Sequence, residues 1–224
     1  MSGLALAVAG ERVTARLSGA LWIESHGALI VADLHFEKGS SFALRGQLLP
    51  PYDTGETLVR LEAEVVALAP RLIVFLGDAL HDGGAEARLT EADRQRITAL
   101  ASGRELIWIA GNHDHAGPRD LPGECMDELA LGDIRLVHEP AARPAAGEIA
   151  GHLHPCALVP GAGRRRRCFA TDGERLILPA FGAYAGGLNV RDPAIRGLLG
   201  PARLAAVLGA GRVHAIPWNR LRGD

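Results

Sequence analysis

The sequence predicts an α/β (α+β) protein built from two packed β-sheets flanked by helices. Two observations predict it: strand-like and helical segments alternate early in the chain, and strand-hairpin patterns dominate late. Because each apolar face must be covered by another layer, this mixture favours two sheets packed together with helices outside. The chain has 224 residues, of which 48% are hydrophobic, and no repeat or flexible linker divides it. We therefore expect one domain over residues 1–224.

The chain is expected to open with short strands. Apolar residues alternate with small or polar ones over residues 4–8 and 13–17, which predicts two strands. Residues 20–24 and 28–33 predict a hairpin that turns at Ser25-His26-Gly27.

Helices and buried strands are expected to follow in alternation. Asp53 and Glu56 have the spacing of a capping box and precede an apolar-periodic stretch, which predicts a helix. Continuous apolar runs predict strands that are buried on both faces. The expected elements are a helix over 53–68, a strand over 72–76, a helix from 90 to about 100, and a strand over 106–110.

The second half is expected to consist mainly of short strands. Asp172-Gly173 is a strong hairpin-turn signal, so the strands on either side of residues 171–174 should pair. The strands expected here cover residues 134–137, 148–150, 164–170, 175–178 and 213–216.

Composition and charge exclude several classes of protein. The formal net charge is −2 at pH 7, so no global basic field indicates nucleic acid. No apolar run approaches the ~18 residues of a membrane span, and residues 1–10 lack the positive leader of a signal peptide. Cys125, Cys156 and Cys168 form no Cys-x-x-Cys pair, which favours a soluble protein of the reducing cytoplasm.

Five short polar motifs occur in order, and most of them follow an expected buried strand. Ligands gather outside the carboxyl ends of strands in α/β sheets, so residues distant in sequence can meet at one sheet edge. Carboxylate, amide and imidazole groups without a thiolate suit manganese, iron or zinc better than calcium. The motifs are Asp33-Leu34-His35, Gly77-Asp78-Ala79-Leu80-His81, Gly111-Asn112-His113-Asp114, His138 and Gly151-His152-Leu153-His154.

The charges of this set indicate catalysis. Two divalent ions carry +4, and Asp33 with Asp78 carry −2, so the remaining charge can hold a bridging hydroxide as nucleophile and attract a phosphate. Asp78 can bridge the two ions, because a carboxylate has two oxygens. His113 is then a candidate general acid for the leaving oxygen, and Asp114 is a candidate for orienting its imidazole.

Together the five motifs resemble the calcineurin-like metallophosphoesterase superfamily, over roughly residues 28–154. The resemblance implies a four-layer αββα sandwich with a dinuclear metal site. It also implies the acid and orienting roles for His113 and Asp114. The implied ligands are Asp33, His35 and His154 for the first ion, Asp78 as the bridge, and Asn112, His138 and His152 for the second ion.

Three further segments resemble the ligase-associated DNA-damage-response phosphoesterases of the PdeM type. They are residues 32–38 (Ala-Asp-Leu-His-Phe-Glu-Lys), 151–155 and 178–184. This resemblance implies endonuclease activity, usually with manganese, and association with a DNA ligase, a helicase and an exonuclease. We therefore expect a phosphodiesterase that acts on DNA in repair with two divalent ions, Mn²⁺ before Fe or Zn.

Two other functions remain open at this point. The same chemistry could act on a nucleotide or another small phosphodiester, or the fold could serve as a non-catalytic scaffold. Arg164–Arg167 could contact nucleic-acid phosphates, although a solvated strand start also explains the run. Aromatic residues make up only 4% of the chain, which weakens any base-stacking surface.

Several other residues near the motifs have a less definite role. His81 is equally compatible with support of a ligand and with an ordinary loop position. Cys156 is expected to be a small apolar filler, because the ligand set is complete without it. The histidines expected to lie outside the site are His26, His115 and His214.

Overall fold

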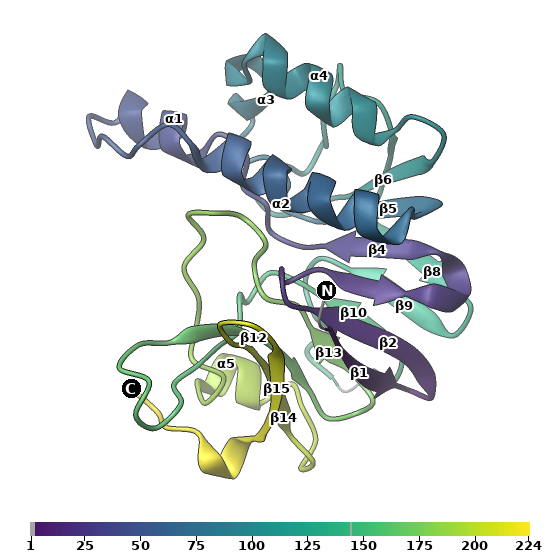
Figure 1. Cartoon of the computed structure of the whole chain (residues 1–224), viewed down its shortest axis with the longest axis vertical. Coiled ribbons are helices and arrows are strands. Elements are labelled where there is room, and N and C mark those ends of the chain that lie inside the picture. The colour runs from purple at the N-terminus through teal and green to yellow at the C-terminus, as the bar shows by residue number, and fades with distance from the viewer. Residues whose placement is uncertain (1–2, 144) are drawn as a thin grey trace.

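A computed structural model describes residues 3–143 and 145–224 and shows two β-sheets packed together, with helices outside them (Figure 1). The first sheet has the strand order β1-β2-β3-β4-β5-β6-β7. The second has the order β15-β14-β12-β13-β10-β9-β8, with β11 beside β12. This arrangement confirms the expected fold class.

The first sheet contains an antiparallel half and a parallel half. Neighbours from β1 to β4 are antiparallel, whereas those from β4 to β7 are parallel. The expected hairpin turn is a 3-10 helix over Glu24–His26, followed by Gly27 with a left-handed φ of 57°. The strands are β1 (Gly3–Val8), β2 (Glu11–Arg16), β3 (Leu21–Ile23), β4 (Ala28–Val31), β5 (Leu72–Leu76), β6 (Glu105–Ile109) and β7 (Glu124–Met126).

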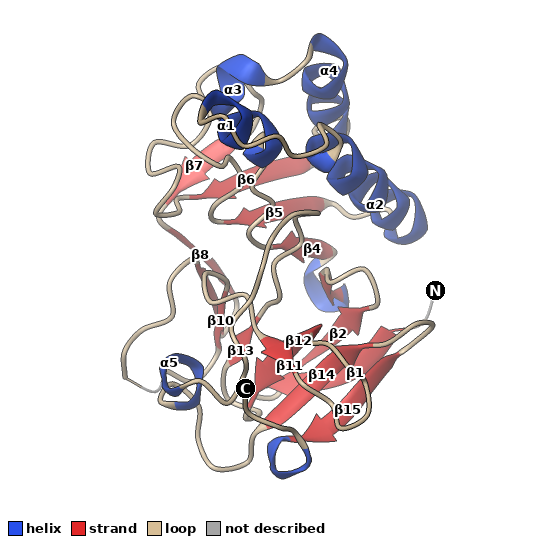
Figure 2. Cartoon of the chain, turned by 90° about the vertical axis from the view of Figure 1, so that its left-hand side faces the viewer, coloured by secondary structure: helices blue, strands red, loops and turns tan. Residues whose placement is uncertain are grey.

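Four helices cover the outer face of the first sheet (Figure 2). They are α1 (Lys38–Leu44), α2 (Asp53–Leu68), α3 (Ala85–Arg88) and α4 (Glu91–Leu100). Leu58 and Leu61 of α2 and Ile97 of α4 share one buried cluster with Phe75 and Trp108 of the sheet. The sequence pattern predicted α2 and α4 but neither α1 nor α3.

The two longer helices begin differently. Thr90 caps α4, because its Oγ1 accepts the backbone N–H of Asp93 at 3.1 Å. The capping box expected at Asp53 is wrong: Tyr52 is the N-cap of α2, and Asp53 is already helical. The Asp53 carboxylate instead accepts the backbone N–H of Gly39 at 2.9 Å, so it ties α1 to α2.

The second sheet is built from short strands and has a thin outer layer. Its hairpin around residues 171–174 is confirmed by the pairing of Thr171 with Leu176. Outside it lie α5 (Pro193–Arg196) and a 3-10 helix at Trp218–Arg220. The strands are β8 (Glu128–Leu131), β9 (Ile134–Val137), β10 (Glu148–Ala150), β11 (Cys156–Ala157), β12 (Arg166–Thr171), β13 (Leu176–Ile177), β14 (Leu204–Leu208) and β15 (Val213–Pro217).

The main core lies between the sheets. Val74 and Ile107 of the first sheet share it with Leu136 and Ile149 of the second. The β9–β10 pair is parallel, like β4–β5 and β5–β6. A parallel bridge between Ala32 and Ala180 joins the end of β4 to the segment after β13. No helix of the described residues is long and apolar enough to cross a membrane.

Candidate metal centre

The seven expected ligands all lie in loops that follow strands. Four of them come from the first sheet and three from the second, so the site straddles the junction of the sheets. Asp33 and His35 follow β4, Asp78 follows β5, Asn112 follows β6, His138 follows β9, and His152 and His154 follow β10.

Asp33, His35 and His154 form one group. Their potential ligand atoms all lie within 4.8 Å of one another. Nε2 of His154 is 3.3 Å from Oδ1 of Asp33 and 3.4 Å from Nε2 of His35. Asp33 is fully buried, and its Oδ2 accepts the backbone N–H of His152 at 3.0 Å.

Asp78, His138 and His152 form a second group within the same 4.8 Å limit. Nε2 of His138 lies 3.4 Å from Oδ2 of Asp78 and 3.2 Å from Nδ1 of His152. Oδ1 of Asn112 is 3.0 Å from Nε2 of His138. The two groups coincide with the division into two ions that the resemblance implies, and the ligand assignment itself stays a prediction.

The donor atoms converge in a way that a divalent cation would satisfy. Nδ1–H of His138 donates to the carbonyl of Leu76 at 3.3 Å, which turns Nε2 toward Asp78 and Asn112. Those oxygens and a neutral Nε2 all present lone pairs to the same space. Burial would lower the pKa of His138, but Asp78 and Asp33 raise it by attracting a proton. A bound cation would take the place of that proton, so these residues fit a metal ion.

Two other groups are held in the protonation state that metal ligation needs. Burial and the neighbouring His154 lower the pKa of His35 to about 3, so its imidazole is neutral. Burial opposes ionisation of Asp78, but the hydrogen bond and charge of His138 and the backbone N–H of His113 hold its pKa well below the usual range. Neutral imidazole and ionised carboxylate are the forms that bind metals.

Backbone strain is concentrated at the same residues. Eight described non-glycine residues have positive φ, and five of them are expected ligands. Side chains other than glycine adopt this conformation rarely, and it persists where the surrounding structure enforces it. The backbone thus holds these side chains in orientations that a relaxed loop would not provide. The five are Asp33 (54°), His35 (48°), Asp78 (47°), His152 (68°) and His154 (46°).

Two glycines allow the close approach of the ligand loops. A Cβ on Gly77 would lie 2.0 Å from Nδ1 of His138. A Cβ on Gly111 would lie 2.2 Å from both the backbone nitrogen and Oδ1 of Asp78. The glycines that precede Asp78 and Asn112 in the motifs are therefore required by space.

The surroundings of His113 differ from the expectation. Its Nδ1–H donates to the carbonyl of His81 at 2.9 Å, and its Nε2 lies 4.0 Å from Oδ2 of Asp78. Among the described residues, Asp114 makes no hydrogen bond or ion pair with the ring; its oxygens accept the backbone N–H groups of Gly111 and Leu80, each at 3.0 Å. The orienting partner of His113 is therefore the His81 carbonyl, and Asp114 holds the backbone of two motifs.

His81, left open by the sequence, lies inside the site. Its ring stacks on that of His113 with centroids 5.4 Å apart, and its Nδ1 is 3.5 Å from Nδ1 of His35. Burial and the charge of Lys38 lower its pKa to about 4. Cys156 belongs to none of the metal-capable groups found among the described residues, nor do His26, His115 and His214.

Sequence reasoning missed Arg60 and the supporting contact of Arg167, although it singled out the run Arg164–Arg167 that contains the second arginine. Arg60 on α2 donates to the carbonyl of Phe181 at 2.6 Å, and Arg167 on β12 donates to the carbonyl of Gly182 at 2.6 Å. The backbone N–H groups of Phe181 and Gly182 in turn donate to Ala32 and Asp33. The two arginines therefore hold the segment that supports Asp33. Arg60 carried no sequence signal, because it lies in an ordinary amphipathic helix.

Comparisons with known proteins agree with this centre. Residues 28–170 match the calcineurin-like phosphoesterase family. A crystal structure of the nuclease MPE of Pseudomonas putida is similar at 27% identity and a TM-score of 0.75, covering 96% of this chain and 100% of that one. YfcE, a phosphoesterase from E. coli, aligns at 14% identity and a TM-score of 0.39 over 84% of this chain and 97% of that one.

No curated protein matches the chain at a significant level. The family match covers more than half of the chain, including every expected ligand. The chain therefore belongs to the calcineurin-like phosphoesterase family and is a metal-dependent hydrolase.

Proposed function

We propose that the protein is a phosphodiesterase that cleaves DNA. The observation that carries this proposal is the meeting of two metal-capable groups at the junction of the sheets, in a chain that is similar over 96% of its length to a nuclease. A third group, made of His35, Asp78 and His113, shares one residue with each of these two. Two neighbouring ions would suit a phosphodiester, because paired cations can stabilise both the attacking and the leaving oxygen of an in-line displacement.

The chain's own residues divide the work in the proposed reaction. Bound divalent ions would supply Lewis acidity and lower the pKa of a water molecule. Asp33 and Asp78 provide the negative charge that holds them. Because Nδ1–H of His113 is committed to the His81 carbonyl, Nε2 is the atom that faces the centre. From Nε2, His113 donates a proton to the leaving oxygen.

The remaining assignments follow from the donor set and from resemblance. Mn²⁺ is the proposed metal, because mixed carboxylate, amide and imidazole ligation suits it. Action in DNA repair, in the cytoplasm and beside a ligase, a helicase and an exonuclease, is proposed from resemblance to the ligase-associated phosphoesterases.

A substrate panel on one Mn²⁺-loaded preparation tests the proposal. Bis(p-nitrophenyl) phosphate, p-nitrophenyl phosphate, a mononucleotide phosphodiester and supercoiled plasmid are assayed in parallel, with chelated enzyme as the control. We expect metal-dependent hydrolysis of the aryl diester together with nicking of the plasmid.

Each other outcome has a definite meaning. Intact plasmid beside hydrolysis of the mononucleotide diester would replace DNA by a small-molecule substrate. Metal binding without cleavage of any phosphoester would replace the enzyme by a scaffold. Activity with Zn²⁺ or Fe²⁺ but not with Mn²⁺ would overturn the metal assignment alone.

A further inference from the structure

A groove lined by arginines is connected to the metal centre by the hydrogen bonds from Arg167 to Gly182 and from Gly182 to Asp33. Its walls are Arg60 of α2 and the run Arg164–Arg167 at the start of β12, and Ser18 also lines it. The groove has a volume of about 390 Å³, and the described residues that line it include no carboxylate. This arginine groove concentrates positive charge on a chain whose net charge is only −2.

Most of that charge is not neutralised. Arg165 pairs with Asp224 at 2.7 Å, whereas Arg60 and Arg167 donate to backbone carbonyls, which carry no net charge. The side chains of Arg164 and Arg166 have no hydrogen bond or ion pair within residues 3–143 and 145–224. Five guanidinium groups facing one carboxylate leave about four positive charges around the groove, which attract a polyanion.

The arginine groove is tied to the metal centre through the backbone. Cys156 pairs with Arg167 and Ala157 pairs with Arg166, so β12 runs beside the residues that follow His154. On the other side, Gly182 accepts from Arg167 through its carbonyl and donates to Asp33 through its N–H. A mononucleotide bound at the centre would leave the groove empty, whereas a nucleic-acid strand carries a phosphate at every nucleotide and can occupy both.

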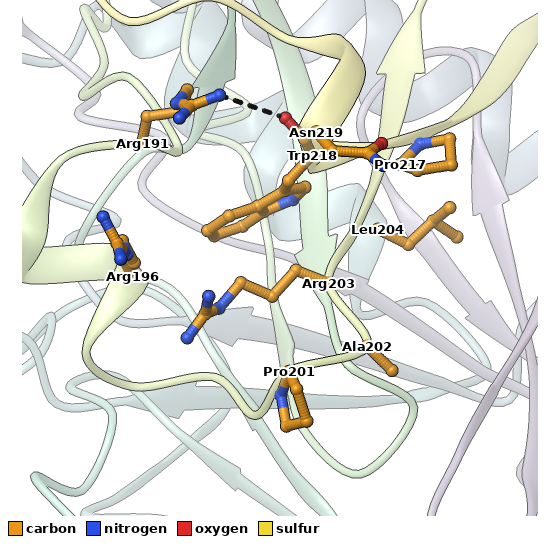
Figure 3. Close-up of a pocket in the computed structure, with 9 residues that line it drawn as sticks. All are labelled: Arg191, Arg196, Pro201, Ala202, Arg203, Leu204, Pro217, Trp218 and Asn219. Atoms are coloured by element: carbon orange, nitrogen blue, oxygen red, sulfur yellow. Dashed lines mark hydrogen bonds between the residues drawn. The ribbon is translucent and has the colours of Figure 1, made fainter.

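A second basic pocket serves for comparison (Figure 3). Arg191, Arg196 and Arg203 surround Trp218 there, in a cavity of about 550 Å³. Arg191 donates to the carbonyls of Trp218 and Leu221, and Arg203 donates to Leu199 and lies 5.6 Å from the Trp218 ring. Among its arginines, only Arg196 has a side chain without a partner in the described residues. Two of the three arginines in this pocket are therefore engaged in contacts within the protein.

We propose that the arginine groove binds the phosphate backbone of the nucleic-acid strand next to the bond that is cleaved, with Arg164 and Arg166 as the phosphate-contacting residues. The inference rests on the proposed function, and it adds that the substrate strand extends from the metal centre into the arginine groove. Arg60 and Arg167 are positioning residues within the same groove, because their donors are committed to residues 181–183.

Binding and its salt dependence test the proposal. A fluorescent single-stranded oligonucleotide is titrated with full-length protein in Mn²⁺ at several KCl concentrations, in a His113→Ala background that prevents cleavage. The double variant Arg164→Ser/Arg166→Ser is compared with its parent and with Arg196→Ser as the matched control. We expect the double variant to bind about tenfold more weakly and the slope of log K against log salt to fall by about 1.4, that is ~0.7 for each phosphate contact.

The outcomes separate this inference from the proposed function. The double variant could keep the affinity and the salt slope of its parent, and the same two substitutions in a chain that keeps His113 could leave plasmid nicking unchanged. That result would overturn the role of the arginine groove but not the proposed nuclease activity. An equal loss in Arg196→Ser would overturn the assignment to this groove. Equal losses of aryl-diester hydrolysis and DNA binding, with a lowered melting temperature, would make the arginines structural. A wild type that hydrolyses the aryl diester but neither nicks nor binds DNA would overturn both.

Discussion

Arg167 donates a 2.6 Å hydrogen bond to the carbonyl of Gly182, whose own N–H is bonded to the carbonyl of Asp33 at 3.1 Å. A guanidinium on the second sheet is therefore two hydrogen bonds away from the backbone carbonyl of Asp33, which follows a strand of the first sheet. The segment in between has no room for a side chain at residue 182, because a Cβ on Gly182 would lie 2.1 Å from the Leu34 carbonyl. The position of Asp33 thus depends on a contact between the sheets.

Replacing Arg167 by Ala should loosen this support. The carbonyls of Gly182 and Ala183 lose a charged donor, so we expect the free energy of unfolding to fall by about 1–3 kcal/mol. Urea unfolding in chelator measures that fall, and Mn²⁺ titration measures the accompanying loss of affinity. Arg167→Lys should restore part of both, and Arg166→Ala on the same strand should change neither. Wild-type metal affinity in Arg167→Ala would contradict the positioning role.

Gly77→Ala should displace His138. Gly77 has a φ of 75°, and its Cβ would lie 2.0 Å from Nδ1 of His138. Gly103 is a matched control, with a φ of 70° and nothing within 4 Å of its Cβ. Gly103→Ala should cost about 1 kcal/mol of folding free energy through the backbone alone. Gly77→Ala should lower the folding stability by roughly 1–3 kcal/mol more than Gly103→Ala does, and it should also lose bound metal. Equal losses of stability in the two variants would refute the steric argument.

His113→Ala and Asp78→Asn should separate catalysis from metal binding. We expect His113→Ala to keep both ions and lose activity on DNA by a factor of about 10² or more, because a general acid is removed. Asp78→Asn should lose metal occupancy as well as activity. Elemental analysis after gel filtration measures occupancy. His113 also lies in a metal-capable group with His35 and Asp78, so equal metal loss in both variants would make it a ligand.

Chelation should destabilise the whole fold. The candidate ligands come from both sheets, so bound ions join the sheets and stabilise the native state. At a free metal concentration of 100 times Kd, one site contributes about 2.7 kcal/mol. We expect the melting temperature to rise with Mn²⁺ concentration and to fall back to the metal-free value when chelator is added. His113→Ala should show the same rise. A melting temperature independent of metal would contradict this coupling.

Asp172 should make stability depend on acid pH. Burial opposes its ionisation, but the backbone N–H groups of Arg175, Gly200 and Glu174 lower its pKa. The folded pKa therefore lies below the unfolded value of about 3.9. Its contribution is present above that value and is lost as the pH falls through the folded pKa. Asp172→Asn should thus destabilise at pH 7 and progressively less in acid. A difference between wild type and Asp172→Asn that stays constant with pH would refute the assignment.

The sequence predicted the candidate ligands better than the residues that hold their backbone in place. Asp33, Asp78 and Asn112 follow apolar runs, and parallel strands bring their carboxyl ends to one edge, so periodicity alone brought these residues together. His138 was likewise predicted to end a strand. In the structure Asp33, Asp78, His138 and His152 lie in groups that could hold a metal ion, and their role as ligands stays a prediction.

Residues that act through long-range contacts were not predictable in this way. Asp53 has the spacing of a capping box, but a tertiary contact with Gly39 takes its carboxylate. Asp114 sits beside His113 in sequence, yet its oxygens bind the backbones of Gly111 and Leu80. The role of Arg60 depends on Phe181, which is 121 residues away. Local patterns report periodicity and turn chemistry, and they contain no information about such partners.

The division of the ligands between the sheets also orders events during synthesis of the chain. Asp33, His35, Asp78 and Asn112 leave the ribosome first, but the two groups of expected ligands also need histidines at positions 138, 152 and 154. Chains fold from the N-terminus as they emerge. A nascent chain therefore exposes half-sites that hold ions weakly, and stable capture waits until the second sheet has docked. Metal loading is therefore expected to follow completion of the second sheet.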